Sequence, residues 1–417
     1  MLEQLLDNEL WFSIFENFKE KSSFNRAKIK AYKEILEKKD HIKSAKKILN
    51  QKYEFSIPKK LEINKLDTGK KKTIYVFPPL DDFVLKAISK ILTENFAHLV
   101  SDACHSFQQN KGAKTAFRSI LKDKSIDDKF AFKTDISNYF NSIDITLFLE
   151  SLPASIKQNR DIMWVLDKIL NNNKALYKNK LIIEPKGLMA GSAIAPFLSN
   201  LYLHDIDDYF VSQKVTYARY SDDIIFFDDK YSLQNYIVFL NKELTKKNLT
   251  INESKTNIFE PNTEWTFLGF SYSKGTIDIA KATQQKLKRK ISRLSRRYNK
   301  LHVEKKLTDN QTLTMFINKL NRKMLGKNFN NSDLCWSRWY FPLINTSNTL
   351  KVIDKFVQDK LRYSVNGHYS KLNYKQTPYS ILQELDYQPI TKLFYLFKHD
   401  FEKFNKIVQK LNISLQT

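Results

Sequence analysis

A hairpin-like stretch with two adjacent carboxylates at its centre constrains the fold of this chain more than any other feature. Residues 215–220 and 224–227 are β-prone, and Ser221, Asp222 and Asp223 lie between them, which predicts two antiparallel strands joined by a polar turn. An ordinary acidic turn would also explain the pattern, since Ser and Asp are common turn residues. The apolar flanks predict burial, however, and two unpaired carboxylates there would repel each other and lose hydration. A divalent cation such as Mg²⁺ relieves that cost, because it prefers hard oxygen ligands and is often shared with substrate phosphates.

Two stretches upstream complete a pattern that suits phosphoryl transfer. A pair of metal ions needs carboxylates from more than one turn, and a short apolar strand predicted at 130–134 leads into Asp135. Between the two acidic sites, residues 187–192 form a loop of small residues, which permits close approach of a backbone to a ligand. An apolar, helix-like segment follows at 197–206.

The order of these motifs, strand with Asp135, glycine loop with helix, then the Tyr220-Ser221-Asp222-Asp223 hairpin, resembles the palm of polymerases. The sequences of these motifs are similar to those of bacterial reverse transcriptases related to group II intron, retron and phage-defence enzymes. The resemblance implies an α+β fold, a right-hand polymerase with fingers and palm of antiparallel sheet plus helices and a helical thumb. The expected domains are a helical N-terminal extension at 1–65, fingers at 66–130, a palm with fingers-side insertions at 131–275, and a helical thumb and C-terminal region at 276–417.

The resemblance also implies the chemistry, which is nucleotidyl transfer with two Mg²⁺ ions or, as a substitute, Mn²⁺. Asp135, Asp222 and Asp223 would be the catalytic carboxylates and the metal ligands. The backbone carbonyl of Ile136 would be a further ligand. One ion would activate a 3′-hydroxyl, and the other would hold the triphosphate of a dNTP.

Further residues are expected around the nucleotide. Phe140 lies five residues after Asp135, where reverse transcriptases place an aromatic ring under the sugar to exclude a 2′-hydroxyl; without the resemblance it would be a core aromatic. Lys255 would stabilise or protonate pyrophosphate, with a plain surface lysine as an equal alternative. Met189-Ala190-Gly191 occupies the position where the family commonly has Pro-Gln-Gly. The polar contact of that glutamine is therefore missing, which leaves open how accurately this chain copies and how it binds a template. The predicted nucleotide contacts are Lys70, Lys72, Phe140, Gly191, Ser192, Tyr220 and Lys255.

Charge and amphipathic pattern predict the nucleic-acid contacts. The chain has 69 Lys and Arg against 45 Asp and Glu, a net charge of +24, which favours a polyanionic partner over a merely solvated cationic surface. The helix predicted at 285–298 has one apolar and one basic face, which suits a thumb that follows a duplex. The segment at 265–270 is similar to the strand and turn that support the end of the primer in this family. The predicted contacts are Lys111, Lys114, Arg118, Phe267, Gly269, Lys288, Arg289, Arg293 and Arg296.

Compartment and partners follow from what the sequence lacks. Cys104 and Cys335 are too few for a disulfide framework or a zinc finger. No apolar run reaches about 18 residues, and the start lacks a signal-peptide pattern. We therefore expect a cytoplasmic protein with no membrane partner. Its expected partners are an RNA template, which a dedicated non-coding RNA would supply in a defence system, the DNA product and dNTPs, with a protein partner or a homo-oligomer left open.

The leading hypothesis is an RNA-directed DNA polymerase acting in bacterial antiphage defence, most similar to stand-alone enzymes of the abortive-infection or unknown-group type. A template-independent or protein-primed DNA polymerase is one alternative. A non-catalytic nucleic-acid-binding protein on a palm scaffold is another, because a fold alone does not confer activity. An RNA-dependent RNA polymerase is disfavoured by Phe140.

Overall fold

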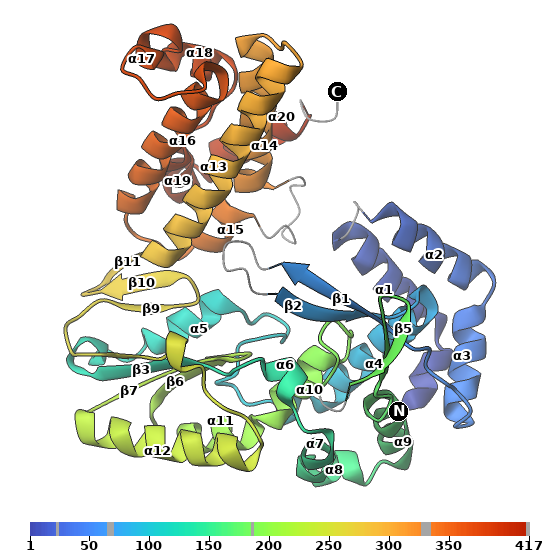
Figure 1. Ribbon diagram of the computed structural model, residues 1–417. Helices are drawn as coiled ribbons and strands as arrows, with labels where there is room; N and C mark the ends of the chain where they lie inside the picture. Colours follow the sequence, from blue (N-terminus) through green and yellow to red (C-terminus); the bar gives the residue numbers. More distant parts are fainter. Residues whose placement is uncertain (22–24, 65–70, 185–186, 327–334, 414–417) are drawn as a thin grey trace. The chain divides into compact units, whose positions relative to one another are not determined.

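The computed structural model describes residues 1–21, 25–64, 71–184, 187–326 and 335–413 (Figure 1). The chain divides into two compact units, Met1–Pro261 and Asn262–Thr417. Lys70, one of the predicted nucleotide contacts, lies outside the described residues. In the described parts of the chain, no helix combines the length and apolar character that a membrane crossing requires.

The first unit begins with helices that pack around a long and mostly buried helix, α4 (Pro79–Phe96). Trp11 and Tyr32 contact Phe83 of α4, with ring centroids 5.0 and 4.3 Å apart. Tyr32 also donates a hydrogen bond to the buried Asp82 of the same helix. The elements before α4 are η1 (Leu2–Leu6), α1 (Asn8–Lys21), α2 (Arg26–Glu37) and α3 (Asp40–Leu49).

A four-stranded sheet in the order β2-β1-β4-β5 comes next. Its strands are β1 (Lys59–Asn64), β2 (Lys71–Val76), β4 (Lys174–Tyr177) and β5 (Lys180–Ile183). β1 and β2 pair antiparallel, with Leu61 opposite Ile74. The region expected to be helical up to residue 65 therefore ends in a strand. Leu61 and Ile63 alternate with polar residues at the period of a strand, and this segment pairs with β2 and β4 on its two sides.

The second sheet of this unit contains the predicted hairpin and has the order β6-β7-β3-β8, with every pair antiparallel. Its strands are β6 (Thr216–Tyr220), β7 (Asp223–Asp228), β3 (Phe130–Asp135) and β8 (Asn257–Phe259). The side chains of residues 224–227 are all buried, so both faces of β7 are covered. Helix α12 (Lys230–Lys246) packs against β3 and β7, and α5 (Ala113–Ile120) packs against β6 (Figure 1). The predicted hairpin and the strand before Asp135 are confirmed.

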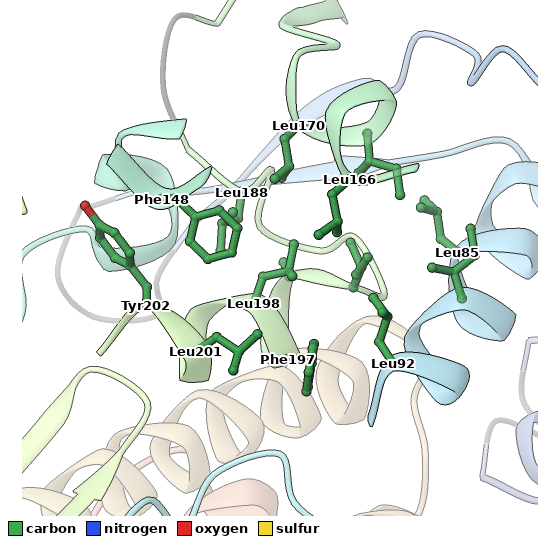
Figure 2. Packing of buried hydrophobic residues seen from close by; sticks show 14 of the residues in the cluster. Leu85, Leu92, Phe148, Leu166, Leu170, Leu188, Phe197, Leu198, Leu201 and Tyr202 are labelled. Atoms are coloured by element: carbon green, nitrogen blue, oxygen red, sulfur yellow. The ribbon is translucent and has the colours of Figure 1, made fainter. Parts of the chain in front are cut away.

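The glycine loop leads directly into α10 (Ala195–Tyr202), whose side chains are buried except for the half-buried Pro196. Figure 2 shows Leu198, Leu201 and Tyr202 of α10, and Leu188 of the loop, gathered around Phe148. This packing fixes the end of the loop. The other helices of the unit are η2 (Ala97–Leu99), η3 (Ile126–Asp128), α6 (Tyr139–Ser142), α7 (Ile145–Ser151), α8 (Ala154–Lys157), α9 (Arg160–Leu170), α11 (His204–Ser212) and η4 (Glu253–Lys255).

The second unit has a small antiparallel sheet followed by helices. The sheet has the order β11-β10-β9, with β9 (Trp265–Phe267), β10 (Phe270–Ser273) and β11 (Thr276–Ile279). The helices are α13 (Lys281–Glu304), α14 (Asp309–Leu325), α15 (Trp336–Tyr340), α16 (Asn348–Asn366), α17 (Asn373–Gln376), α18 (Tyr379–Glu384), α19 (Ile390–His399) and α20 (Phe401–Ile413). The chain thus has the predicted α+β fold, in which the strands pair mainly antiparallel.

Candidate active site

The turn between β6 and β7 carries the adjacent carboxylates. Tyr220 pairs with Asp223 across the hairpin, so Ser221 and Asp222 form a two-residue turn. Ser221 has a left-handed backbone with φ +61°, which suits the tight turns that join two antiparallel strands. Asp135, the last residue of β3, lies opposite Asp223 in the neighbouring strand pair. The structure therefore brings the three predicted catalytic carboxylates to one end of the sheet.

Backbone contacts fix this arrangement. The amide of Ile136 donates to the carbonyl of Asp222 at 3.0 Å, which joins the end of β3 to the turn. The amide of Asn252 donates to the carbonyl of Asp135 at 2.7 Å. Asp135 is 5% exposed, and Asp222 and Asp223 are half-buried, so all three carboxylates are partly removed from water.

The charges of these carboxylates oppose one another. Burial raises the pKa of Asp222, and the nearby charge of Asp135 raises it further. Burial also raises the pKa of Asp223 to about 6, helped by the charges of Asp222 and Asp135. A site that gathers and desolvates like charges in this way is a candidate functional site, because it calls for a positive charge to stabilise it.

Lys255 supplies such a charge in the structure. Its Nζ lies 2.6 Å from Oδ2 of Asp135, and the Lys255 side chain is 53% exposed. The short helix η4 and the hydrogen bonds of Asn252 carry Lys255 to this position. The sequence left two alternatives for Lys255, a contact with the leaving pyrophosphate or a plain surface lysine. Its position beside Asp135 puts an ammonium group next to the carboxylates.

The donor set suits a divalent cation in kind. Among the described residues, no group of three or more His, Cys, Asp or Glu side chains is close enough to enclose a metal ion. The charge of Asp135 nevertheless raises the pKa of Asp222 and of Asp223, and hard oxygen ligands with mutual repulsion fit a cation that completes its coordination with water and substrate phosphates. Metal binding by Asp135, Ile136, Asp222 and Asp223 stays a prediction.

A buried ion pair supports the turn, and the sequence did not single it out. Arg219 and Asp207 are both 0% exposed. Arg219 Nε donates to Asp207 at 2.7 Å, and the guanidinium also donates to the carbonyls of Ser221 and Asn200 at 3.3 and 3.1 Å. The available signal was an arginine inside an otherwise apolar strand, which must find an acceptor when it is buried.

The glycine loop lies between β2 and the segment after Asp135. The amide of Tyr75 in β2 donates to the carbonyl of Ala190 at 2.8 Å. Gly191 has φ +105°, and a Cβ there would lie 2.9 Å from the carbonyl oxygen of Tyr75, so only glycine fits without a shift. Ser192 is buried, and its Oγ has no hydrogen-bond partner among the described residues. Leu188 donates its amide to the carbonyl of Phe140 at 2.7 Å, so the loop and Phe140 are held together.

The other predicted nucleotide contacts lie on different elements of the first unit. Phe140 is half-buried, and its ring contacts that of Phe107. Lys72 is exposed on β2. Tyr220 ends β6 opposite Asp223, and burial, followed by the charge of Asp223, raises the pKa of its hydroxyl. Their contacts with a nucleotide stay predictions.

The predicted nucleic-acid contacts divide between surface and interior. Lys111 forms an ion pair with Asp102 at 2.8 Å, and Arg118 is exposed on α5, where Lys114 is half-buried. Phe267 is 0% exposed, so its ring is a core side chain of the second unit and offers no contact surface there. Gly269 has φ +88°, and a Cβ would lie 2.9 Å from the hydroxyl of Tyr340.

Helix α13 has the predicted amphipathic character. Leu287 and Ile291 are buried. The basic residues of the prediction lie outside this face: Lys288 is half-buried with its Nζ 5.3 Å from the ring centroid of Phe356, while Arg289, Arg293 and Arg296 are exposed.

Three carboxylates at the end of two adjacent strands of an antiparallel sheet are the arrangement expected from the order of motifs in the sequence. Residues 45–272 match the family model described as "Reverse transcriptase (RNA-dependent DNA polymerase)". The match spans more than half of the 417 residues, and the chain belongs to the reverse transcriptase family.

Two curated relatives show how far the similarity reaches. The "Uncharacterized 91 kDa protein in cob intron" of Schizosaccharomyces pombe is 26% identical over 165 residues, which are 40% of this chain and 20% of that protein. "Group II intron-encoded protein LtrA" of Lactococcus lactis subsp. cremoris is 22% identical over 169 residues, which are 40% of this chain and 27% of that protein. The chain therefore matches only about a fifth to a quarter of the length of these relatives.

Solved structures similar to this chain include two of apo telomerase from Candida tropicalis. One, truncated from its C-terminal domain, has a TM-score of 0.44 and 15% identity, covering 54% of this chain and 55% of the telomerase chain. The other has a TM-score of 0.46 and 13% identity, covering 85% and 64%.

Proposed function

We propose that this protein is an RNA-directed DNA polymerase, which adds dNTPs to a 3′-hydroxyl. One observation carries the proposal: in a chain of the reverse transcriptase family, Asp135, Asp222 and Asp223 converge at one end of an antiparallel sheet, where burial and neighbouring negative charge raise the pKa of Asp222 and Asp223. Such carboxylates are the groups that phosphoryl transfer between nucleotides needs.

The residues of the chain would mainly bind and position the reactants. The chemistry supplied by two Mg²⁺ ions, or by Mn²⁺, when Asp135, Ile136, Asp222 and Asp223 hold them, is acidification of the 3′-hydroxyl and neutralisation of the pyrophosphate. Lys255, beside Asp135, would shift to the leaving pyrophosphate and stabilise its charge or protonate it. Lys72 and the amides of the loop at Gly191 would hold the triphosphate. Positioning and charge neutralisation then carry most of the rate.

Selection of deoxynucleotides would rest on Phe140. Its carbonyl is held by Leu188 of the glycine loop, so the ring is kept next to the loop that would contact the nucleotide. A bulky ring there leaves no room for a 2′-hydroxyl. This favours dNTPs over rNTPs and a DNA product over an RNA product.

The rest of the proposal concerns organisation and biological role. Residues 66–130 would serve as fingers, 131–275 as palm and 276–417 as thumb, with the exposed arginines of α13 on the backbone of the template–product duplex. The net charge of +24 supports a nucleic-acid partner. The resemblance to stand-alone bacterial enzymes supports a role in antiphage defence, in the cytoplasm and with a non-coding RNA as the template.

Primer extension with the purified full chain tests the chemistry. The reaction would contain an RNA template, a DNA primer, dNTPs and Mg²⁺. We expect extension by the wild type and none by Asp222→Asn, since the substitution removes a charge that the reaction needs but leaves the turn intact. Asp228→Asn, at the far end of the same strand β7, is the matched control and should extend normally. An Asp222→Asn variant with wild-type extension would refute the assignment.

A further inference from the structure

Phe107 is an exposed aromatic residue in an unfavourable backbone conformation. Its side chain is 48% exposed, and its φ is +55°. A left-handed backbone is uncommon for a bulky residue that is not glycine and persists only where the surrounding structure enforces it. A large apolar side chain that stays exposed to water contributes little hydrophobic free energy to folding. Its position therefore needs another explanation.

The residues before Phe107 are fixed to the hairpin that carries Asp222. His105 donates its amide to the carbonyl of Arg219 in β6 at 2.8 Å. Ser106 is 0% exposed; its Oγ donates to Oδ1 of Asn200 at 2.9 Å and accepts from the amide of Ser221 at 2.9 Å. The side-chain amide of Asn200 donates to the carbonyl of Ser106 at 2.7 Å. Phe107 thus follows directly after the buried Ser106, whose side chain is hydrogen-bonded to the Ser221–Asp222 turn.

The ring of Phe107 contacts the ring of Phe140. Their centroids are 6.2 Å apart, and the ring planes cross at 77°, an edge-to-face geometry that aromatic pairs prefer. Phe140 comes from the segment after Asp135, and its ring also contacts that of Tyr139, at 5.7 Å and 64°. Tyr139 is buried and its hydroxyl donates to the carbonyl of Ser199. The half-buried Phe140 ring therefore has a fixed neighbour in Tyr139 and a second, exposed one in Phe107.

We propose that Phe107 is a positioning residue that holds the Phe140 ring in place and thereby sets the discrimination between deoxynucleotides and ribonucleotides. The inference rests on the proposed function, in which Phe140 excludes the 2′-hydroxyl. A ring that excludes one oxygen atom must not rotate away from it. Without Phe107, the exposed side of the Phe140 ring loses its support, and the space that a 2′-hydroxyl needs becomes accessible.

Single-nucleotide incorporation by the full chain tests this role. The quantity measured is the ratio of kcat/KM for a dNTP to kcat/KM for the matching rNTP. An edge-to-face pair is worth about 2- to 12-fold in an equilibrium constant, so Phe107→Ala should lower the ratio by about that factor, mainly through a lower KM for the rNTP. Phe107→Tyr keeps the ring edge and should retain the wild-type ratio. Phe12→Ala, which removes a phenylalanine that is 54% exposed on α1, is the matched control and should also retain it.

A double variant separates positioning from direct contact. Phe140→Ala should lower the ratio more than Phe107→Ala does, and Phe107→Ala combined with Phe140→Ala should match Phe140→Ala alone, because Phe107 acts only through Phe140. Additive losses would overturn the positioning role, as would a Phe107→Ala variant that slows dNTP and rNTP incorporation equally.

The same assay distinguishes failure of this inference from failure of the proposed function. A wild-type ratio in Phe107→Ala, with a lowered ratio in Phe140→Ala, overturns the inference and leaves the role of Phe140 standing. A wild-type ratio in Phe140→Ala overturns both. A wild-type protein that incorporates no nucleotide overturns the polymerase proposal itself and this inference with it.

Discussion

Arg219 and Asp207 form an ion pair that is completely removed from solvent next to the Ser221–Asp222 turn. Tyr217 donates its hydroxyl to Asp207 at 2.7 Å, so the carboxylate has several donors. Taking two charges out of water costs free energy that the pair recovers only through such close and numerous hydrogen bonds. At the scale of single residues, this network holds the Ser221–Asp222 turn in place.

Removing one partner of this pair should be far more damaging than removing both. We expect Arg219→Met to lower the free energy of unfolding by about 3–5 kcal/mol, because Asp207 would stay buried without its cation. The double variant Arg219→Met with Asp207→Leu should recover part of that loss. Urea unfolding followed by circular dichroism measures both. A single variant that loses less than about 1 kcal/mol would contradict the account.

The residues of the site were predictable in unequal measure. Asp135, Asp222 and Asp223 could be recognised because carboxylates next to apolar strands are unusual and their spacing along the chain follows a known order of motifs. The contacts of Asp207, Ser106 and Phe107 could not be predicted. An arginine in an apolar strand signals that an acceptor exists, but the sequence does not say which of many carboxylates it is, since Asp207 becomes its partner only through tertiary packing.

At the scale of secondary-structure elements, His105 links the hairpin to helix α5. Its backbone amide donates a hydrogen bond to the carbonyl of Arg219 in β6. Its ring nitrogens lie 3.1 Å from the hydroxyls of Thr115 and Ser119 on α5. Burial, with a smaller contribution from the charge of Lys111, lowers the pKa of His105 to about 4. The folded protein therefore holds this imidazole neutral.

The stability of the protein should fall on acidification because of this histidine. Below its usual pKa of about 6.5, the unfolded chain binds a proton that the folded chain binds only near pH 4, so stability is lost as the pH falls through this window. In His105→Gln this contribution is absent, and thermal unfolding between pH 7 and pH 4 should show a smaller fall. The other titrating groups are common to both proteins. Identical pH profiles would show that His105 does not contribute.

The prediction of elements succeeded where the pattern was local. The hairpin, the strand before Asp135 and the amphipathic helix at 285–298 follow from the spacing of their apolar residues, and the structure contains all three. β1 was not predicted, because it is short and its apolar side chains, Leu61 and Ile63, are 46% and 50% exposed. Its stabilising hydrogen bonds come from pairing with β2 and β4, which a single stretch of sequence does not reveal.

At the scale of the whole molecule, the excess of positive charge is the feature that matters for partners. The net charge is +24, and part of it is ordered along the solvent face of α13, where Arg289, Arg293 and Arg296 are exposed. When protein cations contact phosphates, the nucleic acid releases bound counterions. The affinity of the protein for the nucleic acid therefore depends on the salt concentration.

Replacing these three arginines by alanine should weaken binding of an RNA–DNA duplex and flatten its salt dependence. If each arginine contacts one phosphate, the slope of log K against log salt should decrease in magnitude by about 2 to 3. Fluorescence anisotropy over a range of salt concentrations measures the slope. The charge-matched control replaces Lys30, Lys33 and Lys38, exposed on and just after α2 in the other unit, and should retain the wild-type slope. Equal slopes in all three proteins would contradict a duplex contact by α13.

The central claim is that an RNA template directs DNA synthesis by this protein. Changing one template base tests this claim most directly. The wild-type protein would receive a DNA primer on two RNA templates that differ only in the first unpaired base, adenine in one and cytosine in the other, with all four dNTPs and Mg²⁺. We predict addition of T on the first template and of G on the second, with neither product in Asp222→Asn. The same nucleotide added to both primers would contradict RNA-directed synthesis and favour a template-independent polymerase.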